Sequence, residues 1–158
     1  MAHLADTNVL LRWAQPHLPD HPIAMDAVAF LIRGGDMVFI TPQNLIEFWA
    51  VATRPTSANG LGMTPGQADR EVARVEGFFP LLEDMPAIYH KWRSLVTTLL
   101  ISGRQAHDAR LVAVMLTHGV SSFLTFNTAD FARYPDITVV NPHVLVAAQK
   151  AATGTQQP

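Results

Sequence analysis

Acidic and amide side chains follow two of the apolar segments that the sequence marks as strands. Asp6 comes directly after the segment 2–5, and Asn127 and Asp130 come after the apolar run 121–126. In a mostly parallel sheet, ligands gather outside the carboxyl ends of the strands. A buried charge without a partner is very costly, so Asp6, which lies between two apolar runs, requires an exposed position or a positive partner.

Two further carboxylates lie on segments that are otherwise apolar. Glu47 is in the segment 41–54, which is apolar almost all round when it is wound as a helix. Asp108 continues an apolar helical face, because the residues three, four and seven positions later are Leu111, Val112 and Met115. A helix N-terminus favours an anion by roughly 0.3–1 kcal/mol, which does not offset the burial of a charge. Asp108 therefore needs a cation.

These carboxylates come from separate elements that we expect to meet at one end of a sheet. There they repel one another unless a divalent cation binds between them. The chain contains no cysteine, and the two histidines with metal-like spacing, His17 and His21, flank Pro19 in a segment that looks like a loop. Ligands that are all oxygen atoms favour magnesium or manganese over zinc. The sequence therefore predicts a Mg²⁺ or Mn²⁺ site.

Apolar runs of strand length alternate with segments of helical length, and these elements must position the carboxylates. We expect strands at 2–5, 37–41, 121–126 and 137–140, and helices at 21–35, 41–54, 64–77, 85–103 and 104–119. Another apolar segment, 78–83, is a strand candidate that Pro80 places at an edge or a bend. The alternation predicts an α/β fold, with a mostly parallel central sheet and helices on both faces.

Length and composition predict one domain. The chain has 158 residues, of which 49% are hydrophobic and 15% are charged, as expected for a sheet that is covered on both faces. We expect the domain to occupy residues 1–147. The end of the chain is rich in small and polar residues, so we expect residues 148–158 to form a disordered tail.

Charge and segment hydropathy restrict the partners and the location. The net charge of −2 gives no broad attraction for nucleic acid, so any such contact must be local. The stretch 111–127 contains no Asp, Glu, Lys or Arg, but it includes His118, Gly119, Ser121 and Ser122 and does not read as a membrane span. The N-terminus does not read as a signal peptide. We expect a cytoplasmic protein with no membrane partner.

Four stretches of the sequence resemble one known family. They are LADTNVLLRW (4–13), TPQNLIEFWAVATRP (41–55), HDARLVAVMLTHGV (107–120) and FLTFNTADF (123–131). In this order and spacing they resemble the PIN-domain ribonucleases, specifically the VapC-type toxins of type II toxin-antitoxin pairs, over nearly the whole chain. The resemblance implies that residues 1–147 form a PIN-like nuclease domain, which cleaves RNA and is inhibited by a small cognate antitoxin.

The resemblance also implies a role for each site residue. Asp6 and Asp108 would be direct ligands of one or two Mg²⁺ or Mn²⁺ ions, and Glu47 would complete the ligand set or orient the attacking water. Hydrogen bonds to these ligands are expected from Thr7, Asn8 and Thr125. The implied partners are an RNA substrate such as tRNA or rRNA, the antitoxin and a second copy of the chain in a homodimer.

One position departs from the family pattern. The family commonly has a fourth acid where this chain has Asn127, and another acid often follows at the place of Asp130. An asparagine oxygen can still bind a metal ion but contributes no charge. We therefore expect a weaker second metal site, with Asn127 and Asp130 as candidate catalytic residues beside the three acids.

Other interpretations of the same residues remain open. Asp6, Asp108 and Asp130 can each be helix caps, and Glu47 can form a buried ion pair with Arg54 or Arg12. A PIN domain that binds RNA or a protein without cutting is the alternative function, favoured by Asn127. A phosphoaspartate enzyme would need a lysine at a strand end, and neither lysine of the chain lies at one.

Overall fold

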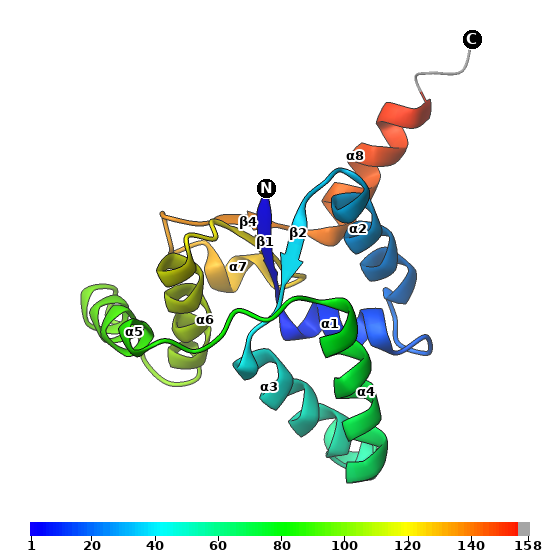
Figure 1. Ribbon diagram of the computed structural model, residues 1–158, viewed down its shortest axis with the longest axis horizontal. Coiled ribbons are helices and arrows are strands. Elements are labelled where there is room, and N and C mark those ends of the chain that lie inside the picture. Colours follow the sequence, from blue (N-terminus) through cyan, green and yellow to red (C-terminus); the bar gives the residue numbers. More distant parts are fainter. Residues whose placement is uncertain (155–158) are drawn as a thin grey trace.

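Four short parallel strands form the centre of the protein. The computed structural model describes residues 1–154. The strands are β1 (Ala2–Ala5), β2 (Met37–Phe39), β3 (Ser122–Leu124) and β4 (Thr138–Val140). Their order in the sheet is β2-β1-β3-β4, and all three pairings are parallel (Figure 1). The chain passes from β1 to one neighbour and later to the other, so the strand order reverses between β1 and β3.

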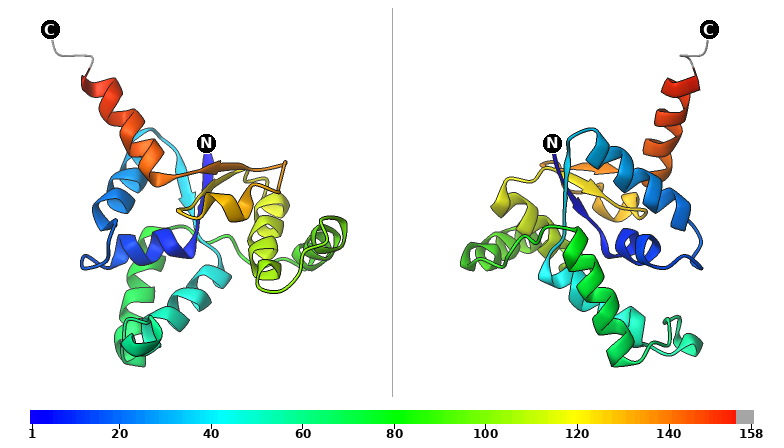
Figure 2. Two further views of the ribbon diagram at one scale, coloured as in Figure 1. Left: turned by 180° about the vertical axis from the view of Figure 1, so that it is seen from behind. Right: turned by 45° about the vertical axis from the view of Figure 1, so that its right-hand side comes forward.

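Helices connect and cover the strands. They are α1 (Thr7–Ala14), α2 (His21–Arg33), α3 (Pro42–Thr53), α4 (Pro65–Phe78), α5 (Pro86–Thr98), α6 (Gln105–His118), α7 (Thr128–Phe131) and α8 (Pro142–Gly154), with a 3-10 turn at Thr56–Ala58. The views of Figures 1 and 2 show three groups around the sheet: α2 with α8, α3 with α4, and α5 with α6.

Alternating residues of the strands enter two separate cores, one on each face of the sheet. Leu4 and Phe123 pack with α5, α6 and α7, whereas their neighbours Ala5 and Leu124 pack with α1, α2 and α3. Successive side chains of a strand point to opposite faces of the sheet, so both faces must be covered by apolar side chains of the helices. The α/β fold predicted from the sequence, with a parallel sheet and helices on both faces, is confirmed.

Two of the helices begin at matched threonine-proline pairs. The hydroxyl of Thr41 accepts a hydrogen bond from the Asn44 amide at the start of α3, and that of Thr64 accepts one from the Gln67 amide at the start of α4. In both cases the side chain of the third helical residue accepts a hydrogen bond from the backbone amide of the threonine. This capping box fixes where each helix starts.

Several elements differ from the sequence prediction. The helix expected at 85–103 is α5, which ends at Thr98. The apolar run after Asp6 is helix α1, which was not expected, because the chain turns from strand to helix at a single residue. The strand expected at 78–83 is wrong: α4 continues to Phe78, and a single bridge joins Leu81 to Ile40. Pro80 lacks an amide hydrogen, which prevents a longer ladder.

The end of the chain differs as well. The tail was expected from residue 148, but α8 is helical to Gly154, and residues 155–158 lie outside the described part. The amide of His143 donates to the Asn141 side chain at the helix start, and the following alanines favour helix. Leu145 packs on the core that contains α2. No helix within residues 1–154 is long and apolar enough to cross a membrane.

Candidate metal centre

The five candidate catalytic residues line one cavity. Its volume is about 610 Å³, and its walls include Asp6, Glu47, Asp108, Asn127 and Asp130. Asp6 follows β1, whereas Asn127 and Asp130 follow β3. The cavity thus lies at the carboxyl ends of β1 and β3, where the strand order reverses and where α/β sheets bind their ligands.

Both carboxylate oxygens of Asp6 are fixed by hydrogen bonds. Oδ1 accepts from the Thr7 amide at 2.7 Å, so Asp6 also caps α1. Oδ2 accepts from Asn8 Nδ2 at 2.8 Å and from Thr125 Oγ1 at 2.6 Å. Asn8 and Thr125 also contact each other at 3.2 Å. The three residues expected to support the ligands therefore lie around Asp6, and the capping interpretation of Asp6 describes the same arrangement.

Burial makes the negative charge of Asp6 unfavourable in the metal-free protein. The side chain is only 8% exposed, and burial raises its pKa from 3.8 to about 6, with smaller contributions from the charges of Glu47 and Asp108. The hydrogen bonds from Thr125 and Thr7 oppose this rise. A cation bound beside Asp6 would favour its ionised form.

Glu47 is held by neutral donors. Its Oε2 accepts from Thr7 Oγ1 at 2.8 Å, and its Oε1 accepts from Gln43 Nε2 at 2.9 Å. The buried ion pair with Arg54 or Arg12 that was considered from the sequence is not formed by the described residues. The charge of Glu47 is therefore oriented but not neutralised, and Thr7 links it to Asp6.

Two residues that the sequence reasoning missed organise this network. Gln43 is 8% exposed, and its Nε2 also donates to the His107 carbonyl oxygen at 2.9 Å, which ties α3 to α6. Asn44 is fully buried, and its Nδ2 donates to Thr7 Oγ1 at 3.2 Å. The sequence contained one indication of the role of Gln43: it lies four residues before Glu47, so the two side chains are on the same side of the helix and can form a hydrogen bond.

Asp108 lies in the first turn of α6 and is half-buried. Its pKa is raised, chiefly by burial and then by the negative charges of Asp130 and Glu47, while Arg104 and His107 oppose the rise. The N-cap position of α6 belongs to Arg104, so capping does not explain Asp108. Like charges and burial both disfavour its ionised form, as they do for Asp6.

Asn127 and Asp130 lie at the open side of the cavity, and both are exposed. Asn127 occupies the N-cap position of α7 without a side-chain capping bond, and Asp130 lies in the first turn of that helix. The charge of Asp130 acts on Asp108. Asp130 thus adds a carboxylate to the cavity that Asp6, Glu47 and Asp108 line, and Asn127 adds an uncharged amide.

The donor set fits a hydrated divalent ion. Within residues 1–154, no three Asp, Glu or His side chains lie close enough together to form a ready ligand cage. Magnesium rarely needs such a cage, because it keeps several waters and binds through one or two carboxylates. Four carboxylates around a cavity of this volume, with no cysteine in the chain, match that chemistry.

Two arginines share the cavity with the acids. Arg54 and Arg104 line it and are exposed. Arg12 instead donates to the Asn8 carbonyl oxygen and stacks over Phe126, and Arg110 pairs with Asp84 at 2.9 Å. Of these four arginines, Arg54 and Arg104 therefore line the cavity.

Fold and cavity together define a single α/β domain with a carboxylate-lined site at one end of a parallel sheet. The PIN domain family model matches residues 4–137. The chain therefore belongs to the PIN domain family, whose members are generally nucleases. No curated protein sequence matches the chain.

Solved structures share this fold over most of their length. VapBC2 from Rickettsia felis, bound to a promoter DNA fragment, matches with a TM-score of 0.68 and 14% identity over 89% of this chain and 98% of that one. VapBC-1 from nontypeable Haemophilus influenzae matches with a TM-score of 0.67 and 17% identity, over 90% of this chain and 99% of that one. VapC20 from Mycobacterium tuberculosis is a toxin that cleaves the sarcin-ricin loop. It matches with a TM-score of 0.58 and 15% identity, over 82% of this chain and 95% of that one. At these identities the similarity shows a common fold.

Proposed function

We propose that this PIN domain is a metal-dependent endoribonuclease and the toxin of a toxin-antitoxin pair. The observation that carries the proposal is the set of carboxylates around one cavity, Asp6, Glu47, Asp108 and Asp130, none of which forms an ion pair within the described residues. Buried acids that repel one another cost stability, and a protein retains them where they bind a cation or do chemistry.

The acids would hold one or two Mg²⁺ or Mn²⁺ ions, with Asp6 and Asp108 as direct ligands and Glu47 beside them. A bound divalent ion would lower the pKa of water and stabilise the charge that grows on the scissile phosphate. Thr125, Asn8 and Thr7 orient Asp6, and Gln43 orients Glu47. These bonds keep both carboxylates in place while substrate binds and leaves.

Arg54 and Arg104 give the cavity its positive groups. Both line the cavity and are exposed, so their guanidinium groups can reach a phosphodiester at the acids. Such contacts are local and agree with a chain whose net charge is −2. They support a selective nuclease rather than a general RNA-binding protein, and we propose tRNA or rRNA as its target class.

The partners follow from the similarity to toxin-antitoxin complexes. Structures of VapBC2, of VapBC-1 and of a Klebsiella pneumoniae toxin-antitoxin complex share the fold of this chain. We extend the same arrangement to this protein: a cognate antitoxin that inhibits it, and a homodimer as the active form, in the cytoplasm.

Cleavage of total RNA by the purified protein tests the proposed activity. With Mn²⁺ or Mg²⁺ we expect discrete fragments that disappear with excess EDTA and with Asp6→Asn. Asp26→Asn is the matched control, because Asp26 is an exposed carboxylate on α2, away from the cavity. Equal cleavage by the wild type and Asp6→Asn would contradict the assignment of the site.

A second candidate is a PIN domain that binds RNA or a protein without cleaving. Asn127 favours it, because this side chain lines the cavity where the family commonly has an acid and adds no charge. The Asn127→Asp variant separates the two candidates. A nuclease whose second metal site is weak should become more active with Asp at this position. A protein that stays inert with this substitution, yet binds RNA, would be a binding module.

A further inference from the structure

A second cavity lies beside the acidic one, between α5 and α6. Its volume is about 440 Å³, within the range of small-molecule sites. Its walls are mostly apolar, and they are formed by Met85, Pro86, Ile88, Tyr89, Trp92, Ala106, His107 and Arg110. None of the proposed metal ligands lines it, so the proposed nuclease chemistry leaves this cavity without a role.

The two cavities are adjacent and share one side chain. His107 lines both, and the next residue, Asp108, faces the acidic one. Arg110, on the wall of the apolar cavity, donates to Gln43 Oε1 at 3.3 Å, and Gln43 in turn holds Glu47. A polymer bound at the acids can therefore extend past His107 to the apolar cavity.

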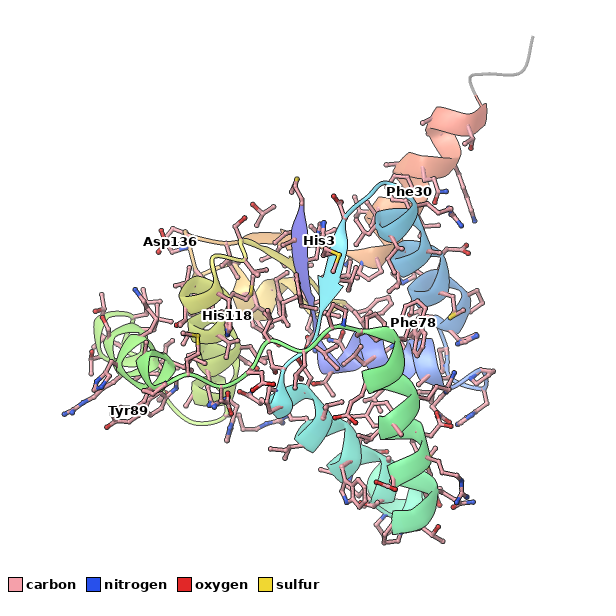
Figure 3. All side chains as sticks on the ribbon, viewed as in Figure 1. His3, Phe30, Phe78, Tyr89, His118 and Asp136 are labelled. Atoms are coloured by element: carbon pink, nitrogen blue, oxygen red, sulfur yellow. The ribbon has the colours of Figure 1, made fainter. Side chains whose placement is uncertain are left out.

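Two aromatic rings form one wall of this cavity. Tyr89 is 54% exposed, and its ring centroid is 6.0 Å from that of Trp92. Trp92 is fixed because its Nε1 donates to the Ala106 carbonyl oxygen at 2.8 Å. Figure 3 shows Tyr89 on α5 at the outer edge of the molecule. A rigid ring beside an exposed one is a suitable surface for stacking a nucleobase.

The charge of this part of the chain favours a polyanion over an apolar peptide. Arg110 is the charged residue of the cavity wall, and it also pairs with Asp84 at 2.9 Å. Residues 85–127, which include α5 and α6, carry one carboxylate, Asp108, although the net charge of the whole chain is −2. The same stretch has four basic side chains, Lys91, Arg93, Arg104 and Arg110. Positive charge interleaved with aromatic residues on one helix is typical of single-stranded nucleic-acid contacts.

We propose that the cavity between α5 and α6 binds a nucleobase of single-stranded RNA next to the scissile phosphate, stacked on Tyr89 and Trp92. The proposal rests on the proposed function, since it names a subsite for the same substrate. It assigns part of the sequence preference to the shape of this cavity. It also requires the target to have an unpaired base there, because a paired base cannot leave its stack without cost.

RNA affinity measured without cleavage tests the subsite. A fluorescent single-stranded RNA is titrated by anisotropy in EDTA against the wild type, Tyr89→Ala, Tyr89→Phe and Trp49→Ala. We expect Tyr89→Ala to bind about 5- to 150-fold more weakly, as for the loss of one stacking platform, and Tyr89→Phe to bind like the wild type. Trp49→Ala is the matched control, an exposed aromatic on α3 outside both cavities. On an RNA of the same length with abasic positions, Tyr89→Ala and the wild type should agree.

The outcomes separate the subsite from the nuclease. Folded Tyr89→Ala that binds the normal RNA as tightly as the wild type would overturn the subsite, even if the wild type cleaves RNA with Mn²⁺. Affinity that depends on Tyr89 in a protein that never cleaves would retain the subsite and refute the nuclease. A change of oligomeric state with Tyr89→Ala at constant RNA affinity would assign the cavity to a protein contact and also overturn the proposal.

Discussion

Asp108 is a proposed metal ligand whose charge is unfavourable for the metal-free fold. It is half-buried, and repulsion from Asp130 and Glu47 adds to the cost of burial in raising its pKa. No hydrogen bond to its side chain offsets this cost among the described residues. The ionised side chain is therefore unfavourable in the metal-free protein, although Arg104 and His107 reduce the cost. Removal of its charge should have opposite effects on stability and on activity.

The Asp108→Asn variant tests this opposition. Without metal, its thermal midpoint should rise by roughly 1–4 °C, which corresponds to up to about 1 kcal/mol in a domain of this size. Its metal-dependent cleavage should fall by a factor of 10² or more, on the order expected when a metal ligand is lost. Scanning fluorimetry in EDTA and the RNA cleavage assay measure the two effects. A variant that loses both stability and activity would indicate a purely structural role.

The pH dependence of the metal-free protein should reveal Asp6. Its pKa is about 6 in the folded protein, and its ordinary value of 3.8 applies to the unfolded chain. At a pH between 3.8 and 6 the folded protein therefore binds more protons than the unfolded one. The free energy of unfolding should therefore decrease as the pH rises through 6, by on the order of 3 kcal/mol in total. Denaturant unfolding in EDTA at pH 4.5 to 7.5 measures this slope.

Variants identify the source of that slope. Asp6→Asn has no titrating group at this position, so its stability should vary less with pH than that of the wild type. Asp26→Asn removes an exposed carboxylate on α2 outside the cavity and should leave the slope unchanged. Added Mn²⁺ should stabilise the wild type more at pH 7.5 than at pH 5, because protons compete with the ion for the carboxylates. Equal slopes in all three proteins would contradict the assignment.

At the scale of elements, the site depends on where α3 begins. The capping box at Thr41 fixes the first turn of α3, which carries Gln43 and, one turn later, Glu47. The same motif at Thr64 starts α4, which does not line the acidic cavity. The chain therefore contains two similar caps, of which one supports the site.

Substitution of the two threonines separates stability from function. Thr41→Ala and Thr64→Ala should each cost about 1 kcal/mol of stability, the usual effect of a lost N-cap. The cost should be larger for Thr41, which is fully buried. Cleavage per folded molecule should fall with Thr41→Ala and remain at the wild-type level with Thr64→Ala. Equal activity of the two variants, normalised for folded protein, would show that α3 does not depend on this cap to position Glu47.

At the scale of the whole molecule, α8 and the acidic cavity lie on different parts of the fold. α8 packs against α2 and leads away from the sheet (Figure 2), and it contributes no residue to the cavity. Residues 148–154 contact the α2 side through Ala148, Gln149 and Ala152, which share a surface pocket with Phe30 and Arg33. The end of α8 should therefore stabilise the domain without taking part in catalysis.

Deletion of residues 148–158 tests whether 1–147 is the functional domain. The shortened protein should lose the contacts of the last two turns of α8, and its thermal midpoint should fall by roughly 2–4 °C. Its RNA cleavage at 25 °C should stay within about twofold of the full chain, since the cavity is intact. Loss of activity in a protein that remains folded by circular dichroism would assign α8 a role in substrate binding or assembly.

The sequence predicted the fold class and the meeting of the acids because both depend on simple patterns. Strand ends and apolar helical faces located Asp6, Asp108 and Asp130, and their common cavity follows from the parallel topology. Gln43 and Asn44 were missed because their role depends on which residues face them across the fold, and no local pattern records that. α1 was missed because a strand-to-helix turn of one residue leaves no loop to mark the boundary.

One hydrogen bond has a consequence for the synthesis of the protein. Thr125 donates to Asp6 over 119 positions of sequence, and β1 gains its second neighbour only when β3 arrives. During translation Asp6 leaves the ribosome early, but it can form this hydrogen bond only after nearly the whole chain has emerged, because domains fold as units. A nascent chain therefore has no assembled acidic centre until its synthesis is almost complete.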